Sequence, residues 1–226
     1  MKASAVAPSN IAFTKYWGRK DEKLRIPENG SISMCLSGLQ TTTTVEFSDK
    51  FKKDDITIND KKDDSAVKRV IAHLNRIRNL AGTKQKAKVA SKNNFPSSTG
   101  LSSSASGFAA LTVAAASAAG LKLPEKQLSI LARLGSGSAC RSIPSGFVEW
   151  SNGTTSDTSY GKQIFKSDQF KIADIVAVVN THKKDVSTTT GQQTATSSPF
   201  LKTRLQKMPK KNIINGALKT YPYISL

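Results

Sequence analysis

A loop rich in serine and glycine leads directly into a run of small apolar residues between Asn93 and Gly120. Six serines lie between residues 97 and 106, and alanine dominates from Ser106 onward. Alanine is the best helix former, and Gly120 followed by Pro124 is a typical end signal, so we predict a helix over the alanine run. The polar loop therefore precedes a helix N-terminus, where unpaired backbone N–H groups and the helix dipole attract anions.

The residues of this loop leave two interpretations open. The loop can be a phosphate cradle, in which glycine lets the backbone close around an anion and hydroxyls add hydrogen bonds. It can also be an ordinary connection whose helix is capped by Ser104 or Ser106. The chain contains no G-x-x-x-x-G-K-[ST] motif and no G-x-G-x-x-G after a strand, which excludes a Walker-type loop and a dinucleotide-binding fold.

The formal net charge of +18 raises the question of nucleic-acid binding. The basic residues are spread along the chain from Lys2 to Lys219, and they mix with acids in residues 49–64. No basic segment alternates with aromatic residues, and no recognition helix or zinc finger is present. We interpret the excess as a solvated surface that also suits a polyanionic small substrate, and we expect no nucleic-acid partner. A basic nucleic-acid binder remains an alternative supported only by charge.

Other features of the sequence indicate a protein of the cytoplasm. No apolar run approaches the ~20 residues that span a bilayer, so we expect no membrane partner. The N-terminus lacks the apolar core of a signal peptide. Cys35 and Cys140 are far apart and form no C-x-x-C motif, so neither a disulfide framework nor a bound metal is predicted.

Hydrophobic periodicity predicts an α+β chain. The predicted strands are residues 3–8, 41–47, 56–58, 86–91 and a buried strand over 173–180. A second helix is predicted over 124–134. An amphipathic helix starts at Ser65 and stops at Gly82, and its apolar face comprises Val67, Val70, Ile71, Leu74, Ile77 and Leu80. A turn-rich boundary near 160–172 separates two lobes, which we place at 1–171 and 172–226.

Three further segments carry groups that bind anions. Residues 7–33 combine Lys15, Tyr16 and Arg19, residues 132–150 contain GSGSACR, and residues 181–191 read THKKDVSTTTG. Lysine offers a point charge and arginine a planar fork to phosphate or carboxylate. Each segment alone can be an exposed loop, but together with the serine loop they indicate a polyphosphorylated substrate.

Five motifs in this order carry a resemblance to a known family. They are NIAFTKYWGR, PENGSIS, NNFPSSTGLSSSASGFAAL, GSGSACRS and KKDVSTTTG. The chain resembles the diphosphomevalonate decarboxylases of the GHMP kinase superfamily over roughly residues 1–211. The resemblance implies a two-lobed α+β GHMP kinase fold, with an N-terminal lobe like ribosomal protein S5 domain 2 and an incomplete C-terminal α/β lobe.

The resemblance also implies roles for individual residues. The family's PxxxGLxSSA loop is its ATP phosphate cradle, which assigns Gly100, Leu101, Ser102, Ser103, Ser104 and Ala105 to the nucleotide. It places Lys15 and Arg141 at the reacting centre, with Arg141 on the carboxylate that is lost. Substrate binding is implied for Tyr16, Arg19, Ser136, Gly137, Ser138, Arg141 and Thr188. A lysine is usual in the family at the position of Arg19.

The implied reaction is the ATP-dependent decarboxylation of mevalonate 5-diphosphate to isopentenyl diphosphate in the mevalonate pathway. Phosphorylation of the tertiary hydroxyl makes it a good leaving group, and Mg²⁺ bridges the ATP phosphates. We expect a homodimer, as is usual in the family. Phosphomevalonate decarboxylase and mevalonate 3-kinase share the fold and remain alternatives.

Two departures from the family pattern have consequences. Pro144 and Ser145 stand where the family has glycines, which affects the local backbone. The family also keeps an aspartate beside the substrate's hydroxyl in its second lobe, whereas no acid follows Asp185 here. Because this carboxylate orients the hydroxyl and accepts its proton, we expect the 226-residue chain as written to bind but hardly to turn over. A non-catalytic binding protein is therefore a further alternative.

Overall fold

A mixed six-stranded sheet is the centre of the structure. The computed structural model describes residues 1–96, 100–177 and 188–208. The strand order is β5-β6-β4-β7-β8, and β1 also pairs with β4. The six strands are β1 (Lys2–Thr14), β4 (Ser31–Ser48), β5 (Asp55–Ile58), β6 (Lys86–Asn93), β7 (Phe147–Trp150) and β8 (Gly161–Phe165). Two short strands, β2 (Arg19–Asp21) and β3 (Ile26–Pro27), form a separate hairpin.

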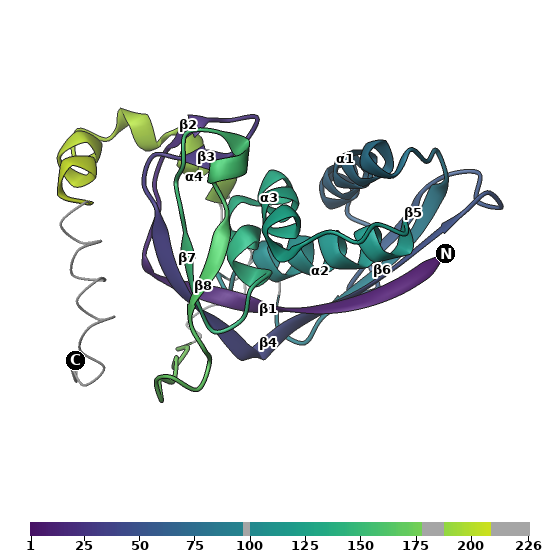
Figure 1. Cartoon of the computed structure of the whole chain (residues 1–226), viewed down its shortest axis with the longest axis horizontal. Coiled ribbons are helices and arrows are strands. Elements are labelled where there is room, and N and C mark those ends of the chain that lie inside the picture. Colours follow the sequence, from purple (N-terminus) through teal and green to yellow (C-terminus); the bar gives the residue numbers. More distant parts are fainter. Residues whose placement is uncertain (97–99, 178–187, 209–226) are drawn as a thin grey trace.

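Three helices, α1 (Asp64–Ala81), α2 (Ser103–Ala118) and α3 (Glu125–Gly135), lie together on one side of the long β1 and β4 strands (Figure 1). The core between sheet and helices contains Val45, Leu74 and Ala115, which are all inaccessible to solvent. The remaining helical elements are short: the 3₁₀ helices Gly137–Ser142, Ser156–Thr158 and Ala195–Ser197, the helix α4 (Thr188–Gln193), and a helical segment over 201–208.

The alanine run folds as the composition predicts, with α2 packed against both β1 and β4. Small alanine side chains allow this helix to be buried on almost every side. Neither Ser104 nor Ser106 caps the helix, so the capping alternative was wrong. The N-cap is Ser102, which has a left-handed backbone (φ 56°) and makes no capping side-chain hydrogen bond. Ser106 Oγ instead lies 2.6 Å from Thr41 Oγ1 on β4.

The amphipathic helix α1 starts with an Asp63 cap and ends at Gly82, whose left-handed φ of 63° closes the C-terminus. One residue of the predicted apolar face is misplaced, because Leu80 is 56% exposed. Arg78 is buried in place of Leu80, and an ion pair with Asp54 compensates the charge of Arg78. A paired charge can therefore take a position near a helix end that an apolar residue was expected to fill.

The α+β prediction is confirmed, while one strand prediction was wrong. Residues 173–177 have no regular structure and are exposed, with Ile175 91% accessible. A strand requires a hydrogen-bonded neighbour, and no described strand pairs with this segment. Residues 178–180 lie outside the described part of the chain. Among the described residues, no helix combines the length and the apolar character that crossing a membrane requires.

Candidate anion-binding site

Arg141 is a buried cation at the junction of three segments that are distant in sequence. It lies in the 3₁₀ helix Gly137–Ser142 and is only 3% exposed. Its Nη1 donates to Ser31 Oγ at 2.6 Å, and its Nη2 donates to Asn10 Oδ1 at 3.2 Å. The β1 register shifts between Pro8 and Ser9, and Asn10 follows this irregularity. The sheet thus supplies two neutral partners to the guanidinium.

The charge of Arg141 has no acidic partner among the described residues. Its guanidinium lies 5.8 Å from the Tyr16 ring centre and 5.5 Å from that of Trp150. Burial lowers the pKa of Arg141, and its Nε is buried with no hydrogen-bond partner in the described chain. A buried cation normally requires a counter-charge. The arrangement is therefore suited to an anionic ligand.

Arg133, eight residues earlier and equally buried, shows what a structural arginine looks like in this fold. Its Nε donates to Leu24 O at 2.9 Å, its Nη1 to Ser156 O at 3.0 Å and to Ser159 O, and its Nη2 to Ser156 Oγ at 2.8 Å. All three nitrogens are thus used within the protein. Arg141, by contrast, keeps an unused donor.

Lys15 and Tyr16 lie near Arg141. Partial burial lowers the pKa of Lys15, the Arg141 charge lowers it further, and Asp174 acts in the opposite direction. Lys15 and Arg141 are therefore within electrostatic reach of one another. The effect of Asp174 was not anticipated from the sequence, because its segment carries no motif.

The GSGS segment packs directly against Tyr16. A Cβ atom on Gly137 would lie 2.9 Å from the Tyr16 hydroxyl and 3.1 Å from Trp150, so only glycine fits without displacement. The Tyr16 and Trp150 rings meet edge to face, with centroids 4.7 Å apart. Ser138 is held from the other side, because its carbonyl accepts a bond of 3.2 Å from Asn10 Nδ2. The predicted residues 16, 137, 138 and 141 are therefore brought together.

The serine loop reaches the same place through Ser104. Ser136 Oγ donates to Ser104 Oγ at 3.3 Å, which joins the GSGS segment to the first turn of α2. Leu101 is anchored by Ser9, whose Oγ donates to its carbonyl at 2.5 Å. Gly100 has φ +97°, and a Cβ there would meet no atom of the described residues within 4 Å.

The other predicted residues of this loop have different surroundings. Ser102 carries the left-handed N-cap, and Ser103 is the first residue of α2. Ala105 is completely buried, so its contribution to any ligand is limited to its backbone. Its N–H donates to Ser102 O at 2.8 Å. Residues 97–99 lie outside the described part of the chain.

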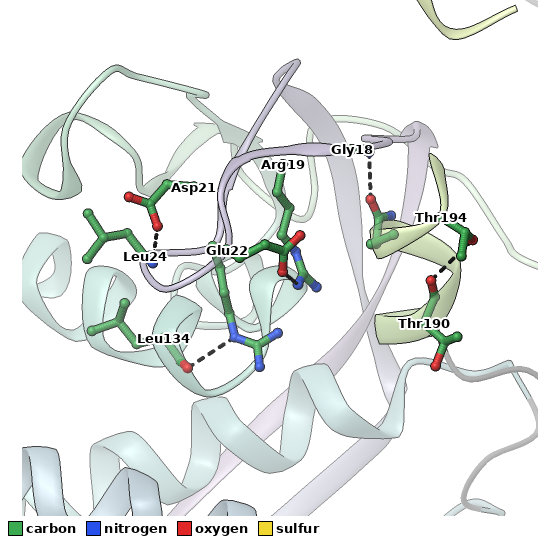
Figure 2. A network of polar contacts seen from close by, with 10 residues as sticks. Gly18, Arg19, Asp21, Glu22, Leu24, Leu134, Thr190 and Thr194 are labelled. Atoms are coloured by element: carbon green, nitrogen blue, oxygen red, sulfur yellow. Dashed lines mark hydrogen bonds and ion pairs between the residues drawn. The ribbon is translucent and has the colours of Figure 1, made fainter. Parts of the chain in front are cut away.

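Arg19 is present beside this site but is already paired. Its Nη1 donates to Glu22 at 2.6 Å, while the side chain is only 3% exposed. Figure 2 shows this ion pair close to Leu134 at the end of α3. Its Nε has no partner among the described residues. Arg19 therefore keeps a donor for a ligand.

Thr188 belongs to α4, and this helix contacts the Lys15–Arg19 segment. Gln192 receives a 2.8 Å bond from the Gly18 N–H and donates to Tyr16 O at 3.1 Å. These bonds place the C-terminal part of α4 beside Tyr16 and Gly18, and they do not place Thr188 itself. The lysines of the same motif, Lys183 and Lys184, lie outside the described residues.

Two residues that support Arg141 were not singled out from the sequence. Asn10 and Ser31 both lie inside motifs that were noticed, NIAFTKYWGR and PENGSIS. They were overlooked because a single amide or hydroxyl has no distinctive spacing, and only the fold shows that both face the same guanidinium.

The assembled groups can bind a polyanion. Two cations, several hydroxyls and the N-terminus of α2 converge, and a low-polarity setting strengthens their attraction for negative charge. Among the described residues, no cluster of His, Cys, Asp or Glu could hold a metal ion. Cys35 and Cys140 are both free thiols in the structure.

Comparison with known proteins gives a consistent result. Residues 7–161 match the family model of the diphosphomevalonate decarboxylase-like N-terminal domain. The chain is 39% identical to diphosphomevalonate decarboxylase of Candida albicans over 227 residues, covering 92% of this chain and 63% of the relative. It is also 39% identical to the enzyme of Rattus norvegicus, covering 92% and 56%. The chain therefore spans less than two thirds of the length of these relatives.

Solved structures agree in fold. MDDEF in complex with MVAPP, AMPPCP and magnesium is 37% identical, with a TM-score of 0.87, covering 97% of this chain and 68% of that one. Mevalonate diphosphate decarboxylase of Staphylococcus aureus is 36% identical with a TM-score of 0.86 and the same coverage.

Proposed function

Since the chain belongs to the diphosphomevalonate decarboxylase family, we propose that it serves the ATP-dependent decarboxylation of mevalonate 5-diphosphate. The products would be isopentenyl diphosphate, ADP, phosphate and carbon dioxide. The chain would supply the greater part of both ligand-binding surfaces, since its residues 7–161 match the family's N-terminal domain.

The observation that carries this proposal is the buried Arg141. It is a cation without an acidic partner in the described chain, it keeps an unused Nε, and Lys15 lies within electrostatic reach. A carboxylate at this position would compensate the charge and satisfy the donor. The tail of the substrate would then extend toward Ser138 and Tyr16, which line the same surface.

The serine loop fits the phosphates of ATP. No described residue lies within 4 Å of the position that a Cβ on Gly100 would take, and the N-cap Ser102 makes no side-chain capping bond. The N-terminus of α2 and the Ser104 hydroxyl can therefore receive an anion. When bound, ATP with Mg²⁺ supplies the phosphoryl group for the substrate's tertiary hydroxyl.

The 3.3 Å bond between Ser136 and Ser104 supports a shared role for the two surfaces. It places the proposed nucleotide loop beside the proposed substrate segment, as a transfer of phosphate between two bound molecules requires. Close approach of oriented reactants is itself a large part of catalysis.

A substrate panel tests the assignment. The protein is incubated with ATP, Mg²⁺ and either mevalonate 5-diphosphate, mevalonate 5-phosphate or mevalonate, and binding, ADP release and carbon dioxide release are followed separately. We expect the tightest binding for the diphosphate and slow turnover of the 226-residue chain, in which any carbon dioxide is released in step with ADP. Preference for the monophosphate would indicate phosphomevalonate decarboxylase, and ADP release from mevalonate without carbon dioxide would indicate mevalonate 3-kinase.

Three further points belong to the proposal. We infer a two-lobed arrangement with a boundary near residue 171, a homodimer in solution and a location in the cytoplasm. Light scattering of the purified protein measures its mass in solution and decides between monomer and dimer.

A further inference from the structure

The connection between β1 and β2, residues 15–18, carries two of the proposed ligand-binding residues, Lys15 and Tyr16. We refer to it as the Lys15–Gly18 loop. It has no regular structure, and the left-handed φ of 78° at Gly18 turns the chain before β2. The buried backbone groups of such a connection need partners from outside it. The partners of the Lys15–Gly18 loop therefore determine where the Lys15 and Tyr16 side chains start.

Gln192 of α4 holds two backbone groups of this loop with a single side-chain amide. Its Nε2 donates to Tyr16 O at 3.1 Å, and the Gly18 N–H donates to its Oε1 at 2.8 Å. Figure 2 shows the bond between Gly18 and α4. Gln192 is only 3% exposed, whereas the neighbouring Gln193 is exposed. The amide thus satisfies a C=O and an N–H two residues apart, as a neighbouring β-strand does.

Asn29 holds the intervening backbone groups in the same manner. Its Nδ2 donates to Lys15 O at 3.2 Å, and the Trp17 N–H donates to its Oδ1 at 3.4 Å. Asn29 is buried and lies just before β4, whereas Gln192 lies 176 residues after Tyr16. Two side-chain amides from distant parts of the chain therefore take the place of strand partners for the loop.

The chain after α4 makes weaker contacts with the same loop. Arg204, in the helical segment 201–208, donates from Nη2 to Lys15 O at 2.7 Å, but this bond is exposed. A Cβ on Gly18 would lie 3.8 Å from Leu201 Cδ2. Both bonds of Gln192 are buried, and a hydrogen bond shielded from water is electrostatically stronger than an exposed one. Gln192 is therefore the main polar link between this part of the chain and the loop.

We propose that Gln192 is a positioning residue, which holds the Lys15–Gly18 loop so that Lys15 and Tyr16 lie beside Arg141. This inference rests on the proposed function, because it concerns residues that would bind the substrate. The Tyr16 ring centre is 5.8 Å from the Arg141 guanidinium, and a displacement of about 1 Å in a site of this kind is costly. The effect should be confined to the substrate, because the described bonds of Gln192 do not reach the serine loop.

The test compares two leucine variants of adjacent glutamines. Gln192→Leu removes both amide groups and keeps an apolar side chain of similar size. Gln193→Leu is the matched control, because it makes the same change at the exposed neighbour. Hydrogen exchange of the Gly18 amide, followed by NMR, reports on the loop without any ligand. Thermal melting confirms that the variants fold.

Calorimetric titration of the same proteins reports on the site. The ligands are mevalonate 5-diphosphate, AMPPCP with Mg²⁺, and inorganic pyrophosphate in the presence of saturating AMPPCP and Mg²⁺. Pyrophosphate is an anionic probe that does not depend on the assigned substrate, and AMPPCP keeps it from the serine loop.

We expect Gln192→Leu to exchange the Gly18 amide about tenfold faster or more, and to bind both mevalonate 5-diphosphate and pyrophosphate about tenfold more weakly, as for the loss of two hydrogen bonds. Its affinity for AMPPCP should be unchanged, which a general loss of stability would not produce. Gln193→Leu should behave as the wild type. Gln192→Asn keeps the amide on a side chain one methylene shorter, so it should restore part of the protection and of the affinity.

The proposal is overturned if Gly18 exchange is unchanged in Gln192→Leu, or if exchange is faster while both diphosphates bind normally. Equal losses for AMPPCP and the diphosphates, or a wild type that binds neither diphosphate, would also overturn it. If Gln192→Leu does not fold, Gln192→Asn replaces it, and wild-type exchange and affinities in that variant count against the proposal. If the wild type binds pyrophosphate in a Gln192-dependent manner but does not bind mevalonate 5-diphosphate, the positioning role stands and the assigned substrate does not.

Discussion

Arg141 donates a hydrogen bond of 2.6 Å from Nη1 to Ser31 Oγ at the first residue of β4. The bond fixes a charged group to the sheet without neutralising it, because serine carries no charge. The donor and its partner are 110 residues apart in sequence, so the orientation of the guanidinium depends on the complete fold. The guanidinium of Arg141 is thus held by uncharged partners, and this is the basis of the first prediction.

Arg141→Gln should weaken binding of mevalonate 5-diphosphate by about 2–5 kcal/mol, as for the loss of one partner of a buried charge pair. Its thermal midpoint should change little, because the replaced cation had no acidic partner to lose. Arg133→Gln is the comparison, since it leaves several carbonyls unpaired and should lower the midpoint clearly. Titration and melting of both variants separate the roles, and a similar fall in midpoint for both would identify Arg141 as structural.

Ser104→Ala should weaken binding of AMPPCP by about 1–2 kcal/mol, as for a lost hydrogen bond to a charged group, with an unchanged thermal midpoint. Ser106→Ala is the matched control on the same turn. Its Oγ contacts Thr41 in the interior, so this variant should melt at lower temperature and bind the nucleotide normally. Equal AMPPCP affinity in Ser104→Ala and wild type would exclude a role for this hydroxyl.

Gly137→Ala should reduce the affinity for the diphosphate substrate more than that for AMPPCP. The added Cβ would approach the Tyr16 hydroxyl to 2.9 Å, so the ring of Tyr16 must move away from Arg141. Gly107→Ala controls for substitution of glycine itself, because a Cβ there meets nothing within 4 Å. If both ligands lose affinity equally in Gly137→Ala, the displacement is not confined to the substrate surface.

The stability of the protein should fall in acid partly through His73. This residue is fully buried, and burial with the nearby Arg76 charge lowers its pKa to about 3. Thr112 Oγ1 donates to Phe108 O and therefore accepts from His73 Nε2, which leaves the buried Nδ1 unprotonated.

Because the unfolded chain binds a proton near pH 6.5, the contribution of neutral His73 is complete above that pH and is lost between about 6.5 and 3. Denaturant unfolding at a series of pH values measures this loss. His73→Gln should show a shallower decline than the wild type over the same range, and parallel curves would show that carboxylates alone cause it.

Both cysteines should react slowly with iodoacetamide at pH 8 in the native protein. Burial raises the pKa of Cys35 to about 11 and that of Cys140 to about 12, so neither thiol is ionised at that pH. The thiolate is the reactive form. In denaturant both should be alkylated rapidly. Rapid modification of either residue in the native protein, detected by mass spectrometry, would contradict the buried position.

The elements with strong local signals were predictable from the sequence. Helix α2 follows from its alanine content, and α1 follows from a regular apolar face and the Gly82 stop. The segment 173–177 failed because an apolar run specifies a strand only when a neighbouring strand is available. Local composition describes what a segment can form, and its partners decide whether it does.

The motifs indicated which segments of the chain could bind anions, because they combine cations, hydroxyls and glycines. Their order along the chain also indicated the family. The sequence could not determine which arginines have a partner inside the protein and which do not. Arg19, Arg133 and Arg141 are the same residue type in the sequence. In the structure, Arg19 is paired with Glu22 and Arg133 donates to backbone carbonyls, whereas Arg141 has no acidic partner among the described residues. Only the tertiary structure decides this, because hydrogen bonds and burial depend on residues more than a hundred positions away, such as Ser31 and Asn10 for Arg141.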